Sequence, residues 1–374
     1  MRLLIDTLGA PERSGGMRLY AEELVKAWAE LDLGDELHVV GYPWTSSAFE
    51  GHPVRVHEVP ETVAIRIAGQ WLYTPYVARR IRADAVLSVS LVASPLVGNR
   101  PRLCTVHDWR HLVRPEEFGW LQRAYRRSWV WSTNHADLAI QISHKTDEET
   151  ARIAPRARRA VVENGQDHAR RWPVVDIPDT HERPVVTFGH HANKRPDLVI
   201  RALAEAFETS GIRTQLTVLG ARGEYADELS RLGTELGLDG WLELPGFVEE
   251  EEYQRRIQGA SAIVLASTDE GFGLPVSEGA YFGITVISTD DNGIDRIHGD
   301  RATVVPPTSS ALAEAMNAAL VGGRLAGRLV GNTWRETAVQ IRTQVLALVK
   351  EQARPDTRLA PGAPVNNDEG RILE

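Results

Sequence analysis

The chain has 374 residues, of which 43% are hydrophobic and 25% charged, and a formal net charge of −9. This composition is that of a globular protein, and the length predicts two domains rather than one core. The most apolar run, residues 85–97, is short and contains Pro95, which excludes a membrane span, and we expect no signal peptide. The single cysteine, Cys104, excludes an intrachain disulfide and a cysteine metal cage and favours a reducing compartment, with the cytoplasm as the expected location.

The charge is unevenly divided between the two halves of the chain. Residues 1–170 contain 22 Lys and Arg against 21 Asp and Glu, whereas residues 171–374 contain 20 against 30. An acidic second half argues against nucleic acid as a partner. Arginines near aromatic residues remain in the first half, at residues 79–82, 123–127 and 152–159. They predict either peripheral contact with an anionic membrane, on its inner face, or a lipid-phosphate acceptor; ordinary solvated helix faces are the alternative.

The chain opens with a strand at Leu3–Ile5, and a helix follows the glycine pair Gly15 and Gly16. Tyr20, Leu24 and Trp28 share one face of that helix at helical spacing. A glycine pair here lets the backbone come close to a ligand, although a plain turn would have the same sequence. The dinucleotide fingerprint GxGxxG is absent, which disfavours a dehydrogenase.

Alternating strands and helices continue to the end of the first half. Strands are predicted in residues 85–95 and 103–107, and His107 stands at the end of the second one. A helix is predicted over residues 118–136, followed by a strand that exits at Ser143, a good helix cap. A lone histidine at a strand end is usually structural, so His107 needs support from other motifs.

The second half repeats the pattern after a proline-rich stretch at residues 169–184, which marks a hinge. The strand at residues 185–189 ends at Gly189, and His190, Lys194 and Arg195 precede a helix that begins at Pro196. Adjacent His190 and His191 would diverge and have no third ligand, so no metal site is predicted. Further strands are expected at residues 216–220 and 242–248.

Residues 262–289 hold the most informative pattern, which is a buried strand, an acidic glycine loop, a short helix and a second strand. Ligands of open parallel sheets bind after the carboxyl ends of the strands. Glu270 and Glu278 stand eight positions apart around Gly271–Gly273 and Pro275, so acceptor carboxylates for hydroxyls lie beside free amides for phosphate. That combination suits a nucleotide sugar; a charged loop capping an ordinary helix is the alternative.

The stretch from Glu270 to Glu278, with GFGLP between, resembles the E-x7-E signature of the retaining nucleotide-sugar glycosyltransferases of family 4 (glycosyltransferase group 1). Further segments resemble the same family in the same order: TVHD at 105–108, ADLAI with a following serine at 136–143, VVENGQD at 161–167 and a last helix that starts at Trp334. The resemblance covers about residues 1–352.

The resemblance implies the GT-B fold, an α/β architecture in which two Rossmann-like, doubly wound parallel-sheet domains face each other across a cleft and a C-terminal helix crosses back. The expected division is an acceptor-side domain at 1–170, a hinge at 171–184 and a nucleotide-sugar domain at 185–335. The crossing helix then occupies 336–352. The composition of residues 353–374 predicts a disordered tail.

The resemblance also implies a set of site residues. The predicted catalytic residues are His107, Lys194 and Glu270, and the predicted donor-binding residues are Gly15, Gly16, Gly189, His190, Arg195, Gly271, Phe272, Gly273, Leu274 and Glu278. Lys194, alone or together with Arg195, would stabilise the departing diphosphate, Glu278 would hold the ribose, and Glu270 and His107 would orient the sugar. The chain departs from the family at His190, where an arginine is usual, at Arg195, where a glycine is common, and at Asp295, where a glutamate is common.

The function implied is transfer of a hexose, with mannose favoured, from a GDP or UDP sugar to an acceptor hydroxyl with retention of configuration and without metal or cofactor. The acceptor would be a glycan, a lipid-linked glycan or a small molecule, and cell-surface glycan biosynthesis is the expected process. Two alternatives stay open. One is glycosylation of a small natural product, and the other is a catalytically weak nucleotide-sugar-binding protein, since His190 and Asp295 depart from the family pattern.

Overall fold

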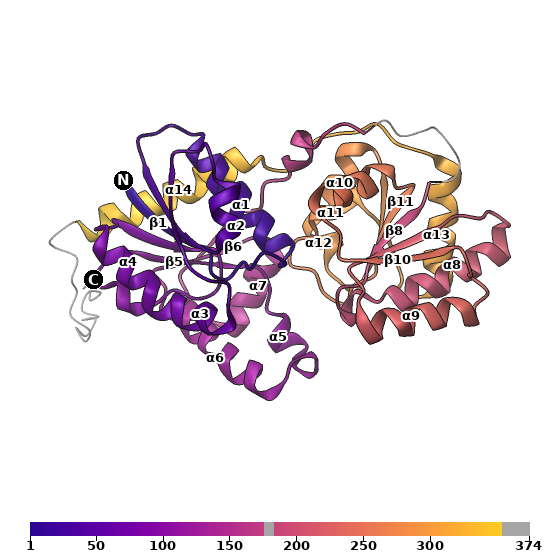
Figure 1. Ribbon diagram of the computed structural model, residues 1–374, viewed down its shortest axis with the longest axis horizontal. Coiled ribbons are helices and arrows are strands. Elements are labelled where there is room, and N and C mark those ends of the chain that lie inside the picture. Colours follow the sequence, from indigo (N-terminus) through magenta and orange to yellow (C-terminus); the bar gives the residue numbers. More distant parts are fainter. Residues whose placement is uncertain (176–182, 354–374) are drawn as a thin grey trace, which may run out of the picture.

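The computed structural model describes residues 1–175 and 183–353. It forms two α/β domains side by side, each a sheet with helices on its faces (Figure 1). The first sheet has seven strands in the order β3-β2-β1-β4-β5-β6-β7, and the second has six in the order β10-β9-β8-β11-β12-β13. All neighbouring strands pair in parallel. The predicted fold class is therefore confirmed.

The first domain is built on short apolar strands that are covered on both faces, as parallel strands require. Its strands are β1 (Arg2–Asp6), β2 (Glu36–Gly41), β3 (Val54–Glu58), β4 (Ala85–Ser88), β5 (Arg102–Val106), β6 (Leu138–Gln141) and β7 (Arg159–Val161). Its helices are α1 (Gly16–Ala29), α2 (Pro43–Ala48), α3 (Val63–Ala68), α4 (Thr74–Arg80), α5 (Arg110–Val113), α6 (Trp120–His135) and α7 (His144–Ile153), with the π-helical turn η1 (Gly69–Tyr73) and the 3-10 turns η2 (Pro95–Val97), η3 (Pro115–Glu117) and η4 (His168–Arg171).

The second domain repeats this arrangement. Its strands are β8 (Val185–Phe188), β9 (Leu216–Leu219), β10 (Leu242–Gly246), β11 (Ala262–Leu265), β12 (Thr285–Thr289) and β13 (Thr303–Val305). Its helices are α8 (Pro196–Ser210), α9 (Gly223–Glu235), α10 (Glu250–Gly259), α11 (Leu274–Phe282), α12 (Ile294–His298) and α13 (Ser309–Gly322), with the 3-10 turns η5 (Ala192–Lys194) and η6 (Gly299–Arg301). The central strands β8 and β11 are neighbours, so the loops that follow them meet at one edge of the sheet.

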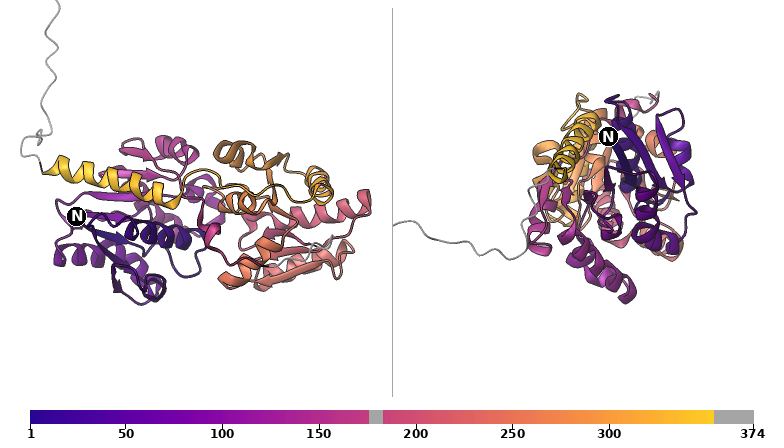
Figure 2. Two further views of the ribbon diagram at one scale, coloured as in Figure 1. Left: turned by 90° about the horizontal axis from the view of Figure 1, so that it is seen from above. Right: turned by 90° about the vertical axis from the view of Figure 1, so that its left-hand side faces the viewer.

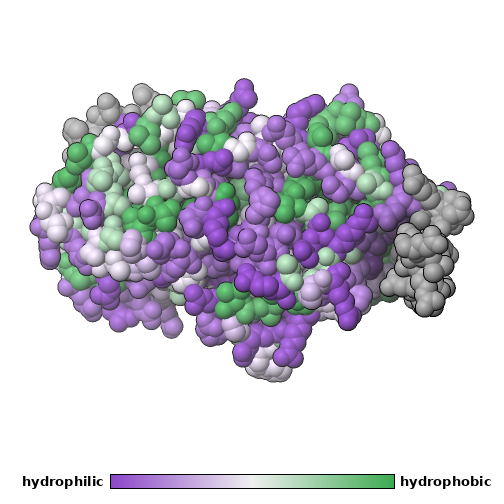
Figure 3. Space-filling model, turned by 180° about the vertical axis from the view of Figure 1, so that it is seen from behind, coloured by the Kyte–Doolittle hydropathy of each residue, from purple (hydrophilic) through white to green (hydrophobic). Residues whose placement is uncertain are grey.

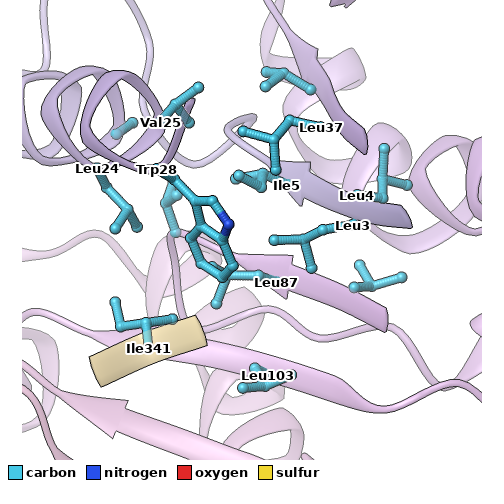
Figure 4. Packing of buried hydrophobic residues seen from close by; sticks show 14 of the residues in the cluster. Leu3, Leu4, Ile5, Leu24, Val25, Trp28, Leu37, Leu87, Leu103 and Ile341 are labelled. Atoms are coloured by element: carbon cyan, nitrogen blue, oxygen red, sulfur yellow. The ribbon is translucent and has the colours of Figure 1, made fainter. Parts of the chain in front are cut away.

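The last helix, α14 (Trp334–Gln352), leaves the second domain and packs on α1 of the first (Figure 2). Its side chains Ile341, Val345 and Leu348 are buried in the core of the first domain. In Figure 4 Ile341 lies beside Trp28 of α1 and near the strand residue Leu87. The guanidinium of Arg342 donates to Asp35 over 2.6 Å. The predicted crossing helix is confirmed.

Trp334 fixes the point at which α14 enters the first domain. The residue is buried, and a Cβ on Gly165 would lie 2.4 Å from its indole, so only glycine leaves room there. We expect Trp334→Ala to lower the free energy of unfolding by about 3–5 kcal/mol, because it opens a large cavity in this packing. Val339→Ala, on the exposed side of the same helix, should change it by less than about 0.5 kcal/mol. Urea unfolding measures both, and equal effects would contradict the role of Trp334.

Two histidines on adjacent strands predict a loss of stability in acid. His38 Nδ1 and His57 Nε2 lie 2.9 Å apart, and His38 also contacts Glu36. Burial, with the neighbouring His38 and Arg80, lowers the pKa of His57. The folded state therefore favours neutral His57. This preference stabilises the fold above about pH 6.5, and the stabilisation is lost as the pH falls towards the lower pKa that His57 has in the folded state. The urea midpoint should fall less between pH 7.5 and 5.5 in His57→Gln than in the wild type, and identical pH profiles would refute this.

Part of the predicted hinge at 171–184, and the predicted tail at 353–374 beyond its first residue, lie outside the described residues. Within residues 1–175 and 183–353, no helix is long and apolar enough to cross a membrane. Seen from behind, the surface carries hydrophobic patches among hydrophilic residues on both domains (Figure 3).

Candidate active site between the two domains

Lys194 and Glu270 meet where the neighbouring strands β8 and β11 end. Lys194 Nζ lies 2.6 Å from Glu270 Oε1, and the hydroxyl of Ser267 donates to the same oxygen over 2.6 Å. Burial opposes ionisation of Glu270, but Lys194 and Ser267 outweigh it, so the pKa of this carboxyl lies below its usual range. Both residues were predicted from the sequence as catalytic residues, and in the structure they form a charged pair.

Arg195 is held firmly within the second domain. Its backbone is left-handed, with φ 47°, directly before α8. Its guanidinium donates to the carbonyls of Ala266 and Ser267, to Thr289 Oγ1 over 3.0 Å and to Asp291 over 2.7 Å. The side chain therefore fixes the ends of β11 and β12 beneath the Glu270 loop.

Gly189 and His190 directly follow β8 and precede Lys194 in the chain. A Cβ on Gly189 would lie 2.6 Å from Val218, so the residue lets the β8 and β9 ends pack closely. His190 is exposed to solvent in part. The protein around its imidazole nevertheless desolvates the ring, and this desolvation, together with the nearby charge of Lys194, lowers the pKa of the imidazole. His190 is therefore neutral near pH 7 and does not replace the positive charge of an arginine.

The glycine loop after Glu270 is pressed against the first domain. A Cβ on Gly271 would lie 2.1 Å from the carbonyl oxygen of His107, so no larger residue fits there. Gly273 has φ 81° and lies against Ile294. Phe272 is buried, and its carbonyl accepts a hydrogen bond from His298 over 2.7 Å. Residues of both domains therefore pack against the loop.

Gly15 precedes α1 and Gly16 begins it, and of the two only Gly16 has the second domain beside the position that a Cβ would take. Gly15 has φ 56°, and a Cβ on Gly16 would lie 3.8 Å from the side chain of Leu274. The glycine turn of the first domain therefore touches the start of α11 in the second.

His107 directly follows β5, and its carbonyl lies against Gly271 of the loop. Its Nε2–H donates to the carbonyl of Val89 over 2.8 Å, and its ring packs edge-on against Tyr20 with centroids 4.8 Å apart. Burial lowers the pKa of His107, so the imidazole is neutral near pH 7. With Nε2 protonated, Nδ1 is a hydrogen-bond acceptor.

Glu278 is more enclosed than the sequence suggests. The residue is 1% exposed, with one carboxylate oxygen 3.0 Å from His168 Nε2 and the other accepting from the Tyr253 hydroxyl over 2.6 Å. Burial, together with the nearby carboxylate of Glu278, raises the pKa of Tyr253 far above its usual value, which keeps the phenol a donor. Any ligand that uses Glu278 must therefore compete with or join these two partners.

Four polar residues around the loop make contacts that were not expected from the sequence. Lys145 on α7 lies 2.5 Å from Asp269 and 2.9 Å from Glu149, and Ser143 Oγ donates to the carbonyl of Gly271 over 3.0 Å. The contacts of Lys145 with Asp269 and of Ser143 with Gly271 join residues more than 120 positions apart in the chain. Ser143 had been expected only as a helix cap, which it also is.

Phe247, after β10, is an exposed aromatic ring at the same edge of the second sheet. The guanidiniums of Arg13, from the first domain, and Arg222, which precedes α9, each lie 5.7 Å from its ring centroid. An exposed ring flanked by two cations suits a flat, electron-rich group. Within the described residues no group of His, Cys, Asp and Glu could hold a metal ion.

Two family models match the chain, one for each domain. "Glycosyltransferase Family 4" matches residues 14–170, and "Glycosyl transferases group 1" matches residues 180–333. The O-antigen chain mannosyltransferase B of Escherichia coli is 25% identical over 218 residues, which are 55% of this chain and 55% of that protein. The D-inositol 3-phosphate glycosyltransferase of Nocardioides sp. is 30% identical over 120 residues, 29% of this chain and 26% of that protein. The alignments thus span about half and a quarter of these relatives.

Solved structures resemble the chain over nearly its whole length. Sucrose-phosphate synthase from Thermosynechococcus elongatus has a TM-score of 0.68 and 17% identity, and the match covers 94% of this chain and 99% of that one. Anabaena Alr3699/HepE in complex with UDP-glucose has a TM-score of 0.66 and 20% identity, with 94% and 98% covered. At these identities the likeness shows the fold.

Proposed function

Because the chain belongs to the glycosyltransferases of group 1 and family 4, with the GT-B fold, we propose that it moves a hexose from a nucleoside-diphosphate sugar to an acceptor hydroxyl with retention of configuration. The pair of Lys194 and Glu270 is the observation that carries the proposal. A bound donor would separate the two side chains, because each would gain a new partner from it. A diphosphate would take the ammonium of Lys194, and a sugar hydroxyl would donate to Glu270.

The chain's own groups suit this reaction. In the transition state negative charge grows on the leaving phosphate, where the fixed positive charge of Lys194 stabilises it most. The neutral His107 would accept a hydrogen bond from the sugar through Nδ1. The amides of residues 271–274 would face the phosphates at the start of α11. The C1–O bond to phosphate would break as the acceptor oxygen bonds C1 on the same face, and the acceptor proton would pass to the leaving phosphate.

We propose mannose as the sugar and GDP as the nucleotide. The support is the similarity to a protein named as a mannosyltransferase. A thermal-shift screen with GDP-mannose, UDP-glucose, UDP-GlcNAc, the free nucleotides and NAD tests this, because a ligand that binds only the folded state raises the melting temperature. A shift with GDP and GDP-mannose alone is expected. A shift with NAD alone would contradict the proposed function, and a shift with the uridine nucleotides would change only the donor.

A catalytically weak binding protein is the second candidate, favoured by neutral His190 and by the exposed Asp295 in place of a glutamate. Product analysis after a pulse of the bound nucleotide sugar separates the two. A new glycoside with the donor's anomeric configuration is expected. Binding without any product or free nucleotide would favour the second candidate.

We also propose that α6 rests on an anionic membrane surface, which would bring the first domain to a lipid-linked acceptor. The helix contains three arginines, three tryptophans and no acidic residue, and Trp120 and Trp131 are 71% and 43% exposed. Exposed tryptophan with arginine is typical of interfacial helices. Co-sedimentation with phosphatidylglycerol vesicles should weaken strongly in Trp120→Ala. Trp241→Ala, at an exposed tryptophan of the second domain, is the control and should leave it unchanged.

A further inference from the structure

We infer that Lys145 of the first domain is a positioning residue for catalysis, which holds Glu270 in place through its partner Asp269. This inference rests on the proposed function, since it concerns the same site. Lys145 touches neither Glu270 nor Lys194 in the contacts of the described residues; it acts on the peptide segment that carries Glu270.

The contact is buried and close, unlike most ion pairs at a protein surface. The side chains of Lys145, Asp269 and Glu149 are 3%, 8% and 10% exposed, and the ammonium lies 2.5 Å from Asp269 and 2.9 Å from Glu149. One cation therefore lies between two carboxylates and offsets part of the repulsion between them. Removing one partner of such a buried group leaves an uncompensated charge, so the geometry is strongly maintained.

The surroundings of Lys145 are shaped to its side chain. A Cβ on Gly293 would lie 2.6 Å from both Cδ and Cε of Lys145, so the second domain offers a groove of glycine backbone along the lysine stem. Gly293 itself has φ 85°, a conformation that favours glycine. The stem of Lys145 thus passes close to the backbone of Gly293, where a larger residue would block it, and its ammonium reaches Asp269.

The loop is held from two directions at consecutive residues. Asp269 is bound by Lys145 of the first domain, and Glu270 is bound by Lys194 of the second. Two further contacts from the first domain, the Ser143 hydroxyl on the Gly271 carbonyl and the close approach of His107 to Gly271, fix the next residue. The position of the Glu270 carboxylate therefore depends on first-domain contacts to the neighbouring residues as well as on Lys194 and Ser267 of its own domain. A misplacement of about 1 Å in such a geometry costs on the order of 100-fold in rate.

The test compares Asp269→Asn and Lys145→Met with an exposed ion pair that also joins the domains. Arg296 and Glu148 lie 3.2 Å apart and are 49% and 61% exposed, so Arg296→Met is the matched control. Asp269→Asn leaves Lys145 paired with Glu149, so this variant still tests the inference if Lys145→Met does not fold. Binding of GDP and UDP is measured by calorimetry, and turnover by release of nucleoside diphosphate from the sugar nucleotide that the screen identifies.

We expect turnover to fall on the order of 100-fold in Asp269→Asn and Lys145→Met, with nucleotide affinity within about threefold of the wild type. The double variant should be no worse than the slower single variant, because both act through one contact. Arg296→Met should keep wild-type turnover. The inference is overturned if folded Asp269→Asn keeps full turnover, or if affinity and turnover fall together. A wild type without turnover on any sugar nucleotide would instead count against the proposed function.

Discussion

Lys194→Ala should lower turnover by a factor on the order of 100–1000, because it removes the positive charge expected to stabilise the departing diphosphate. The ammonium of Lys194 lies 2.6 Å from the carboxylate of Glu270, a partner that a bound donor would replace. Nucleotide release from the sugar nucleotide measures the effect. Binding of the free nucleoside diphosphate should weaken less than turnover, since the charge matters most when the bond to the sugar breaks.

Lys350→Ala is the matched control for this experiment, because Lys350 is exposed in the last turn of α14, the helix that packs on the first domain. Its turnover should equal that of the wild type. Wild-type turnover in a folded Lys194→Ala variant would remove the lysine from the site, and an equal loss in both variants would point to an effect of overall charge.

Glu278→Gln should weaken nucleotide binding by about 10- to 100-fold, the size expected when a hydrogen bond to a charged acceptor is lost. The amide keeps the size of the side chain and can still accept from the Tyr253 hydroxyl, so the fold should be retained. Calorimetry with the nucleoside diphosphate measures the affinity, and turnover at saturating donor should change less.

Tyr253→Phe separates a ligand-binding Glu278 from a purely structural one. It removes one of the two hydrogen bonds to the carboxylate and leaves the charge and His168 in place. If Glu278 binds the donor ribose, Tyr253→Phe keeps nucleotide affinity while Glu278→Gln loses it. Unchanged affinity in Glu278→Gln, or an equal loss in both variants, would contradict the ribose role.

The sequence predicted the fold because the fold depends on local patterns. Apolar strands followed by amphipathic helices require a doubly wound sheet, and the topology of such sheets places strand ends, and hence Lys194 and Glu270, at one edge. The crossing of the last helix was predictable from its apolar face together with the family resemblance, and Trp334 begins it.

The remaining features depend on contacts between segments far apart in the chain. Lys145 lies in the polar run SHKTDEE, which is equally typical of a solvated helix, and only the approach of the second domain makes it a buried partner of Asp269. Glu278 was expected to face the ligand, but its enclosure comes from His168, 110 positions away. The left-handed backbone of Arg195, which turns its guanidinium back into its own domain, has no signal in the local sequence.

The central claim is that this site transfers a hexose from a nucleotide sugar, and the most direct test is nucleotide release. Wild type, Lys194→Ala and Glu270→Gln are incubated separately with GDP-mannose, UDP-glucose and UDP-GlcNAc, and the free nucleoside diphosphate is followed together with the sugar product. We predict release from one of these donors by the wild type and a loss on the order of 100-fold or more in both variants. Release that persists unchanged in the two folded variants would contradict the site, and binding of a donor without release by the wild type would contradict the activity.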